Sequence, residues 1–219
     1  MQESNYVRQA RDARALFLPW DQEAMIHRWN LTADASYLYL WFLAQTYRIC
    51  RTTGQIDRLV DGPSPLNGPP ITRSTAVWEE VLDFSVVMSL YDILCREQVP
   101  PLSGVWLSIH ALPGVVQSRK LGNFIFERGA AEYTGRSAAL SMACKALGGR
   151  QLTGSADVAW EIPILPFFPI QLRFWDADEE FPAKLNILWD RSTPGYFHYE
   201  TLYYIGGCLF SRLKELSGS

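Results

Sequence analysis

The stretch from Asp157 to Glu200 constrains the fold more strongly than any other part of this 219-residue chain. It contains three runs in which every second residue is apolar. They are Val158, Trp160, Ile162 and Ile164, then Ile170, Leu172 and Phe174, and then Leu185, Ile187 and Trp189. Because alternate residues of a strand share one face, we predict three strands, each with a buried face. The second and third strands are expected to pair as a hairpin across the acidic segment DADEEFP.

Apolar residues spaced by three and four, together with capping residues, predict helices before and after these strands. The clearest helix is expected to start at Thr75 and to continue through apolar positions from Val77 to Cys95. A helix over about residues 201–216 carries a leucine-rich stripe that is expected to pack on the sheet. The remaining helices are expected over residues 3–29 with a break at Pro19, over 119–130 and over 136–147.

Strand-forming residues also occur outside the central stretch. Residues 36–56 are dense in aromatic and β-branched residues and predict two or three antiparallel strands, and residues 104–111 alternate as one more strand. Residues 61–75 are rich in Pro and Gly and are expected to form a loop. After a helical lead-in over residues 1–30, this irregular order favours a single α+β domain over residues 1–219. We expect an antiparallel or mixed sheet packed by helices around an aromatic-rich core.

Charge and hydropathy exclude several kinds of partner. The net charge of −3 and the pI of about 5.6 provide no basic field for a phosphate backbone, so nucleic acid is not an expected partner. No apolar run approaches the length of a membrane span, and the start MQESNYVRQARDAR lacks the apolar core of a secretory signal. We therefore expect a cytoplasmic protein without membrane contact.

The chain carries no complete catalytic or cofactor motif. Its four cysteines are far apart, with no CxxC pair and no zinc-like spacing, so we expect reduced, mostly buried thiols and no iron–sulfur cluster. There is no G-x-S-x-G elbow, P-loop, G-x-G-x-x-G or H-E-x-x-H sequence. Known nucleophile and nucleotide-binding schemes are therefore unsupported.

A resemblance to a known family comes from four sequence features of the central stretch. They are Phe174-Trp175, the acidic turn from Asp176 to Pro182, the run from Leu188 to Ser192 that ends in D-R-S, and Phe197-His198-Tyr199-Glu200. Together they are similar to the C-terminal signature of the prokaryotic family called domain of unknown function 3786. The resemblance implies a cytoplasmic protein of largely anaerobic bacteria and archaea, with no established activity. Some relatives carry a cysteine-rich iron–sulfur segment, which this chain lacks.

Polar residues cluster in the same stretch and form a candidate ligand-binding site. They are Trp175, Asp176, Asp178, Glu179, Glu180, Asp190, Arg191, His198 and Glu200. The carboxylates of the turn offer the oxygen ligands that Mg²⁺ and Ca²⁺ prefer. The simpler interpretation is a solvated turn that Phe181 and Pro182 anchor to the core.

The second cluster also has two interpretations. His198 and Glu200, as a His–carboxylate pair, could form a general base or a metal site, and the divalent-metal ligands would be Asp178, Glu180 and His198. Alternatively, they cap the N-terminus of the last helix, where a carboxylate is favoured by the helix dipole.

Three functional hypotheses follow from these observations. The first is a binding or accessory module with a small-ligand pocket near the turn over residues 176–182. The second is a divalent-metal-assisted hydrolase or lyase, in which Asp178, Glu180 and His198 hold the ion and Glu200 or Asp190 acts as base. The third is a structural subunit of a larger complex. The ligand, the protein partner and the oligomeric state cannot be read from the sequence.

Overall fold

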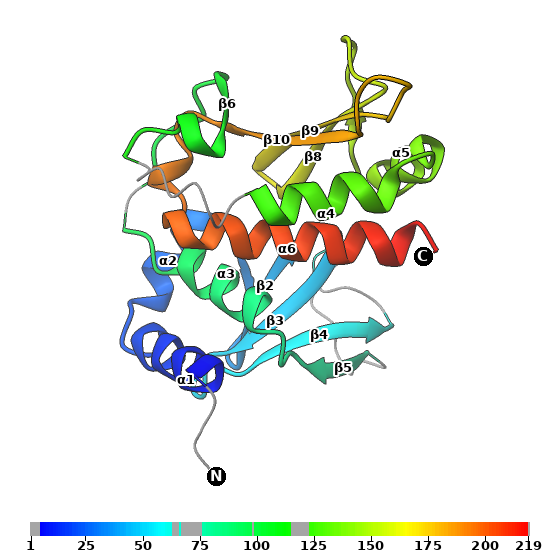
Figure 1. The fold of residues 1–219 in the computed structure, drawn as a ribbon. Coiled ribbons are helices and arrows are strands. Elements are labelled where there is room, and N and C mark those ends of the chain that lie inside the picture. Colours follow the sequence, from blue (N-terminus) through cyan, green and yellow to red (C-terminus); the bar gives the residue numbers. More distant parts are fainter. Residues whose placement is uncertain (1–4, 63–65, 67–75, 98, 115–122, 219) are drawn as a thin grey trace. The chain divides into compact units, whose positions relative to one another are not determined.

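The computed structural model describes residues 5–62, 66, 76–97, 99–114 and 123–218. The chain forms two compact units, Met1–Glu97 and Gln98–Ser219. Both units contain an antiparallel five-stranded sheet, so the predicted α+β class is confirmed (Figure 1). The prediction of one domain over residues 1–219 stays a prediction.

The first unit is a meander with helices at its two chain ends. Its sheet has the order β1-β2-β3-β4-β5, so neighbouring strands are also neighbours in sequence. The elements are α1 (Asn5–Phe17), α2 (Gln22–Trp29), β1 (Thr32–Ala33), β2 (Tyr37–Phe42), β3 (Gln45–Cys50), β4 (Ile56–Asp61), β5 (Val77–Glu80) and α3 (Phe84–Leu94). Helix α2 starts where the sequence predicted, because Asp21 accepts a hydrogen bond from the Ala24 N–H.

The helix predicted from Thr75 is wrong in its first part. Val77–Glu80 is strand β5, paired with β4, and the helix starts only after Asp83, whose side chain accepts hydrogen bonds from the Ser85 and Val86 N–H groups. Thr75 itself, like most of the Pro/Gly-rich segment 61–75, lies outside the described residues. The valines fit a helical spacing, but a β-branched and aromatic segment is also suited to a sheet edge, and pairing with β4 decides the outcome.

Two helices of the second unit contact one face of its sheet, and the last helix, which was expected to pack on the sheet, packs mainly on those two helices (Figure 1). The sheet has the order β6-β10-β9-β8-β7 and is antiparallel throughout. Its strands are β6 (Trp106–Ser108), β7 (Arg150–Gln151), β8 (Val158–Leu165), β9 (Phe168–Trp175) and β10 (Lys184–Asp190). Its helices are α4 (Asn123–Tyr133), α5 (Ser137–Ala146) and α6 (Tyr199–Leu216), with 3-10 turns η2 (Ile109–Ala111) and η3 (Thr193–Gly195).

The three strands predicted from alternation are confirmed, and so is the hairpin between β9 and β10. Their inward residues form an aromatic-rich core with Phe168, Phe174 and Trp189, which are fully buried. The strand predicted over 104–111 ends earlier, because the chain turns into η2 after Ser108. The first four residues of the helix predicted over 119–130 lie outside the described residues.

Two further expectations can be compared with the structure. All four cysteines are free, but only Cys144 and Cys208 are buried, whereas Cys50 and Cys95 are partly exposed. Among the helices that the structure describes, none has the length and apolar character needed to cross a membrane.

Candidate functional site

The acidic segment connects β9 to β10 at one end of the second sheet. Trp175 and Lys184 are paired across the strands, and the Lys184 amine lies 5.9 Å from the centre of the Trp175 ring. Asp178 organises the turn, since its carboxylate accepts hydrogen bonds from the Glu180 N–H at 2.8 Å and from the Phe181 N–H at 2.7 Å. This pattern is that of an aspartate-stabilised turn.

The other residues of the turn face solvent. Glu179, Glu180 and Pro182 are exposed, and Phe181 is 65% exposed. The expectation that Phe181 and Pro182 anchor the turn to the core is therefore wrong. The turn is held by backbone hydrogen bonds to Asp178, which need no apolar anchor.

Asp176 joins the end of β9 to the connection between α4 and α5. Its carboxylate accepts hydrogen bonds from the Gly135 N–H at 2.8 Å and from the Ser137 hydroxyl at 2.9 Å. The hydrogen bond from Gly135 is the main cause of a lowered pKa for this carboxyl, and the Ser137 hydroxyl adds to it. Asp176 therefore fixes two segments in place and stays ionised.

Asp190 is a second anchor, at the opposite end of β10, and it is only 1% exposed. Its carboxylate accepts five hydrogen bonds, from the N–H and hydroxyl of both Ser103 and Ser192 and from the Gly104 N–H. Burial raises the pKa of this carboxyl, but the hydrogen bonds from Ser192 and Ser103 outweigh burial and lower the pKa to about 2. The carboxylate is charged but surrounded by donors, which suits an anchor better than a base.

Arg191, His198 and Glu200 are all exposed. The Arg191 N–H donates to the Val105 carbonyl at 2.7 Å. His198 occupies the N-cap position of α6 without a capping hydrogen bond from its side chain, and Glu200 lies in the first turn. The position of Glu200 agrees with the helix-dipole interpretation.

The structure separates the predicted site into two clusters. Strand β10 runs from Lys184 to Asp190, so the acidic turn and Asp190 lie roughly 20 Å apart at about 3.3 Å per residue. Within the described residues, no three His, Cys, Asp or Glu side chains are arranged to hold a metal ion. The ligand and metal roles of the predicted residues stay predictions.

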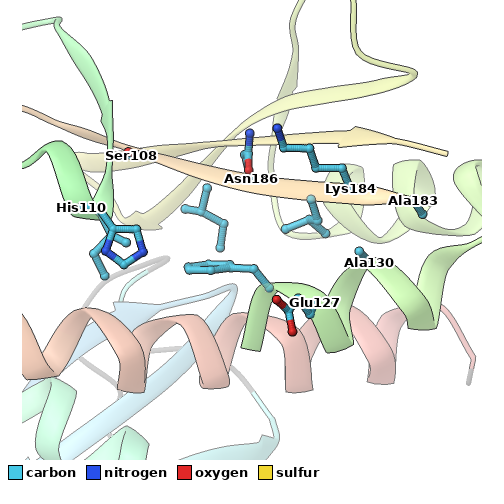
Figure 2. A pocket seen from close by; sticks show the side chains of 11 residues that line it. Ser108, His110, Glu127, Ala130, Ala183, Lys184 and Asn186 are labelled. Carbon is cyan, nitrogen blue, oxygen red and sulfur yellow. The ribbon is translucent and has the colours of Figure 1, made fainter. Parts of the chain in front are cut away.

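A pocket that the sequence did not reveal lies beside the first half of β10. It has a volume of about 280 Å³ and lies between β10, η2 and α4. Its lining consists of Ser108, Ile109, His110, Phe126, Glu127, Ala130 and residues 183–187. Figure 2 shows His110 at the η2 end, with Lys184 and Asn186 pointing to the side of β10 away from α4.

The interior of this pocket is therefore mainly apolar. Leu185 and Ile187 are buried and, by strand alternation, face α4, where Ala130 is also buried. The alternation of β10 indicates which side chains face inward. It cannot show that the small side chain of Ala130 leaves a space there.

The first unit contains an aromatic cluster that sequence analysis also missed. The Arg48 guanidinium lies 4.3 Å from the centre of the Tyr37 ring and 4.5 Å from that of Trp78. Its Nε donates to Asp57 at 2.8 Å. The cation site between these rings is thus occupied by the chain's own arginine.

Comparison with known proteins supports the resemblance and adds no activity. No curated protein and no solved structure matches this chain. The model of one family, described as a domain of unknown function (DUF3786), matches residues 21–212, which is most of the chain. The chain therefore belongs to the DUF3786 family.

Proposed function

We propose that this protein is a cytoplasmic binding module whose ligand places an apolar group in the pocket between β10, η2 and α4. The observation that carries the proposal is the mainly apolar lining of this 280 Å³ space, which lies beside the residues that directly follow the acidic turn. Ligand pockets commonly measure about 300–1,000 Å³, so this one suits a small molecule or one bulky side chain. Removing the ligand's apolar surface from water would supply the affinity.

The carboxylates argue for binding rather than catalysis. Asp176, Asp178 and Asp190 already accept hydrogen bonds from backbone N–H groups, so their oxygens serve the fold. A hydrolase would need a metal or a general base close to a ligand-sized cavity. The described lining of the pocket carries His110, Glu127 and Lys184 as its charged or titratable groups, and they come from three different elements, η2, α4 and β10.

The pocket can be tested by filling it. The substitution Ala130→Phe adds a ring to the lining, and Ala131→Phe is the matched control because Ala131 is the exposed neighbour on the same helix. Indole, toluene and isovalerate at millimolar concentration are suitable probes. At ten times its Kd, a bound probe raises the free energy of unfolding by about 1.4 kcal/mol.

We expect at least one probe to raise the melting temperature and to shift the amide NMR signals of Ile109 and Ile187. Ala130→Phe should remove both effects, whereas Ala131→Phe should keep them. Both variants must give the dispersed spectrum of a folded protein. The proposal fails if no probe binds, or if the probes bind equally well to Ala130→Phe.

A further inference from the structure

One edge of β10 lies beside the pocket. The Arg191 N–H donates to the carbonyl of Val105, the residue just before β6, so Arg191 directs its backbone groups to the β6 side. In an antiparallel ladder, alternate residues direct their N–H and C=O groups to the same neighbour. Trp189, Ile187 and Leu185 therefore also direct their backbone groups to the β6 side, whereas Asn186 and Leu188 direct theirs to β9.

Strand β6 is too short to form hydrogen bonds with all the backbone groups along this edge of β10. It pairs only with Leu188–Asp190, and the chain turns into η2 after Ser108. Among the described residues, no strand pairs with the outer edge of Lys184–Ile187. The backbone N–H and C=O groups of Leu185 and Ile187 thus point to the position that a longer β6 would occupy beside β10.

From this geometry we infer that the pocket binds an extended peptide segment of a protein partner, which continues the ladder of β6 along β10. The inference rests on the proposed function, because the peptide's apolar side chain enters the same pocket. Strand addition at a sheet edge obtains affinity from main-chain hydrogen bonds and specificity from pockets for alternate side chains. The existing β6–β10 ladder sets the antiparallel direction.

Side-chain alternation defines the chemistry of the peptide. A residue opposite Leu185 or Ile187 has its side chain on the pocket face, so it is bulky and apolar. Its neighbours lie on the face that carries Lys184, which is exposed and points away from α4 (Figure 2). An acidic neighbour would complement this lysine. The partner segment therefore alternates apolar and acidic residues.

The first test is amide hydrogen exchange of the full chain, followed by NMR. In the free protein, the amides of Leu185 and Ile187 should exchange at least about tenfold faster than those of Asn186 and Leu188, which bond to β9. Equal protection of all four amides would overturn the inference, because this edge would already be covered.

The second test adds the acetylated and amidated pentapeptide Val-Glu-Leu-Glu-Val at millimolar concentration. Binding should slow exchange of the Leu185 and Ile187 amides about tenfold. N-methylation of the central leucine removes a donor that faces β10 and should weaken binding about tenfold. N-methylation of the first glutamate is the control, because that N–H faces away from β10, and it should bind like the parent.

The outcomes separate this inference from the proposed function. If apolar probes bind but the pentapeptide does not protect these amides, or if the two N-methylated peptides bind alike, the peptide inference fails and the apolar pocket stands. If Ala130→Phe weakens neither probe nor peptide, both proposals fail. A lysine-substituted peptide, Val-Lys-Leu-Lys-Val, should bind more weakly, and tighter binding would contradict the role of Lys184.

Discussion

The two ends of β10 carry aspartates with opposite structural roles. Asp178, in the exposed turn before the strand, accepts hydrogen bonds from N–H groups two and three residues later in the chain. Asp190, buried at the other end, binds Ser103 and Gly104, which lie 87 and 86 residues earlier. One carboxylate shapes a local turn, and the other joins distant segments. The comparison teaches that an acidic cluster in sequence does not define one site.

The substitution Asp190→Asn should have the largest effect on stability. The amide nitrogen cannot accept the hydrogen bonds that serine and glycine donate, and the negative charge is lost. We expect the free energy of unfolding to fall by about 3 kcal/mol, measured by urea unfolding followed by circular dichroism. The matched variant Asp178→Asn should lose less than about 1 kcal/mol. Equal losses would mean that Asp178 and Asp190 contribute equally to the free energy of unfolding, which would contradict their different roles.

The pH dependence of stability checks the same difference. The folded pKa of Asp190 is about 2, below the ordinary value of roughly 3.9 for an unfolded chain. Its contribution is therefore complete above about pH 4 and is lost as the pH falls through about 2. Between these values, wild-type protein should lose roughly 2 kcal/mol more than Asp190→Asn. Parallel pH curves for the two proteins would contradict the assigned role of Asp190.

The sequence predicted most elements of the second unit because they follow local rules. Alternation in β8, β9 and β10 sets their inward faces, and each face is buried as expected. The prediction failed at β5, where Val77–Glu80 pairs with a strand some twenty residues earlier in the chain. The same valines fit both the apolar spacing of a helix and a strand at the edge of a sheet. Only the distant partner distinguishes them.

The candidate site shows the same limit. The sequence identified residues able to carry charge, including Asp176 and Asp190, but it could not identify their hydrogen-bond donors on distant segments. Nor could it predict the pocket, whose lining comes from η2, α4 and β10. Apolar side chains such as Leu185 and Ile187 look like ordinary core residues. A cavity depends on how completely neighbouring elements fill the space, which no local pattern records.

Asp176 should have an intermediate effect, because it is partly exposed yet links two segments. The substitution Asp176→Asn keeps one oxygen, so we expect a loss of about 1 kcal/mol in urea unfolding. A double-mutant cycle with Ser137→Ala should show that the two losses are not additive, since the side chains share a hydrogen bond. Additive losses would place the effect of Asp176 elsewhere, for example in its bond to Gly135.

The exposed glutamates of the turn should matter least for stability. Glu179→Gln and Glu180→Gln alter side chains that face solvent, so each should change the free energy of unfolding by less than about 0.5 kcal/mol. Among the described residues, Glu179 and Glu180 belong to no group of side chains arranged to hold a metal ion. Mg²⁺ and Mn²⁺ should therefore leave the melting temperature unchanged. A rise in melting temperature that disappears in both Glu180→Gln and His198→Ala would reverse this conclusion. It would mean that the turn and the start of α6 share an ion, and that the metal-assisted hydrolase hypothesis should replace the binding module.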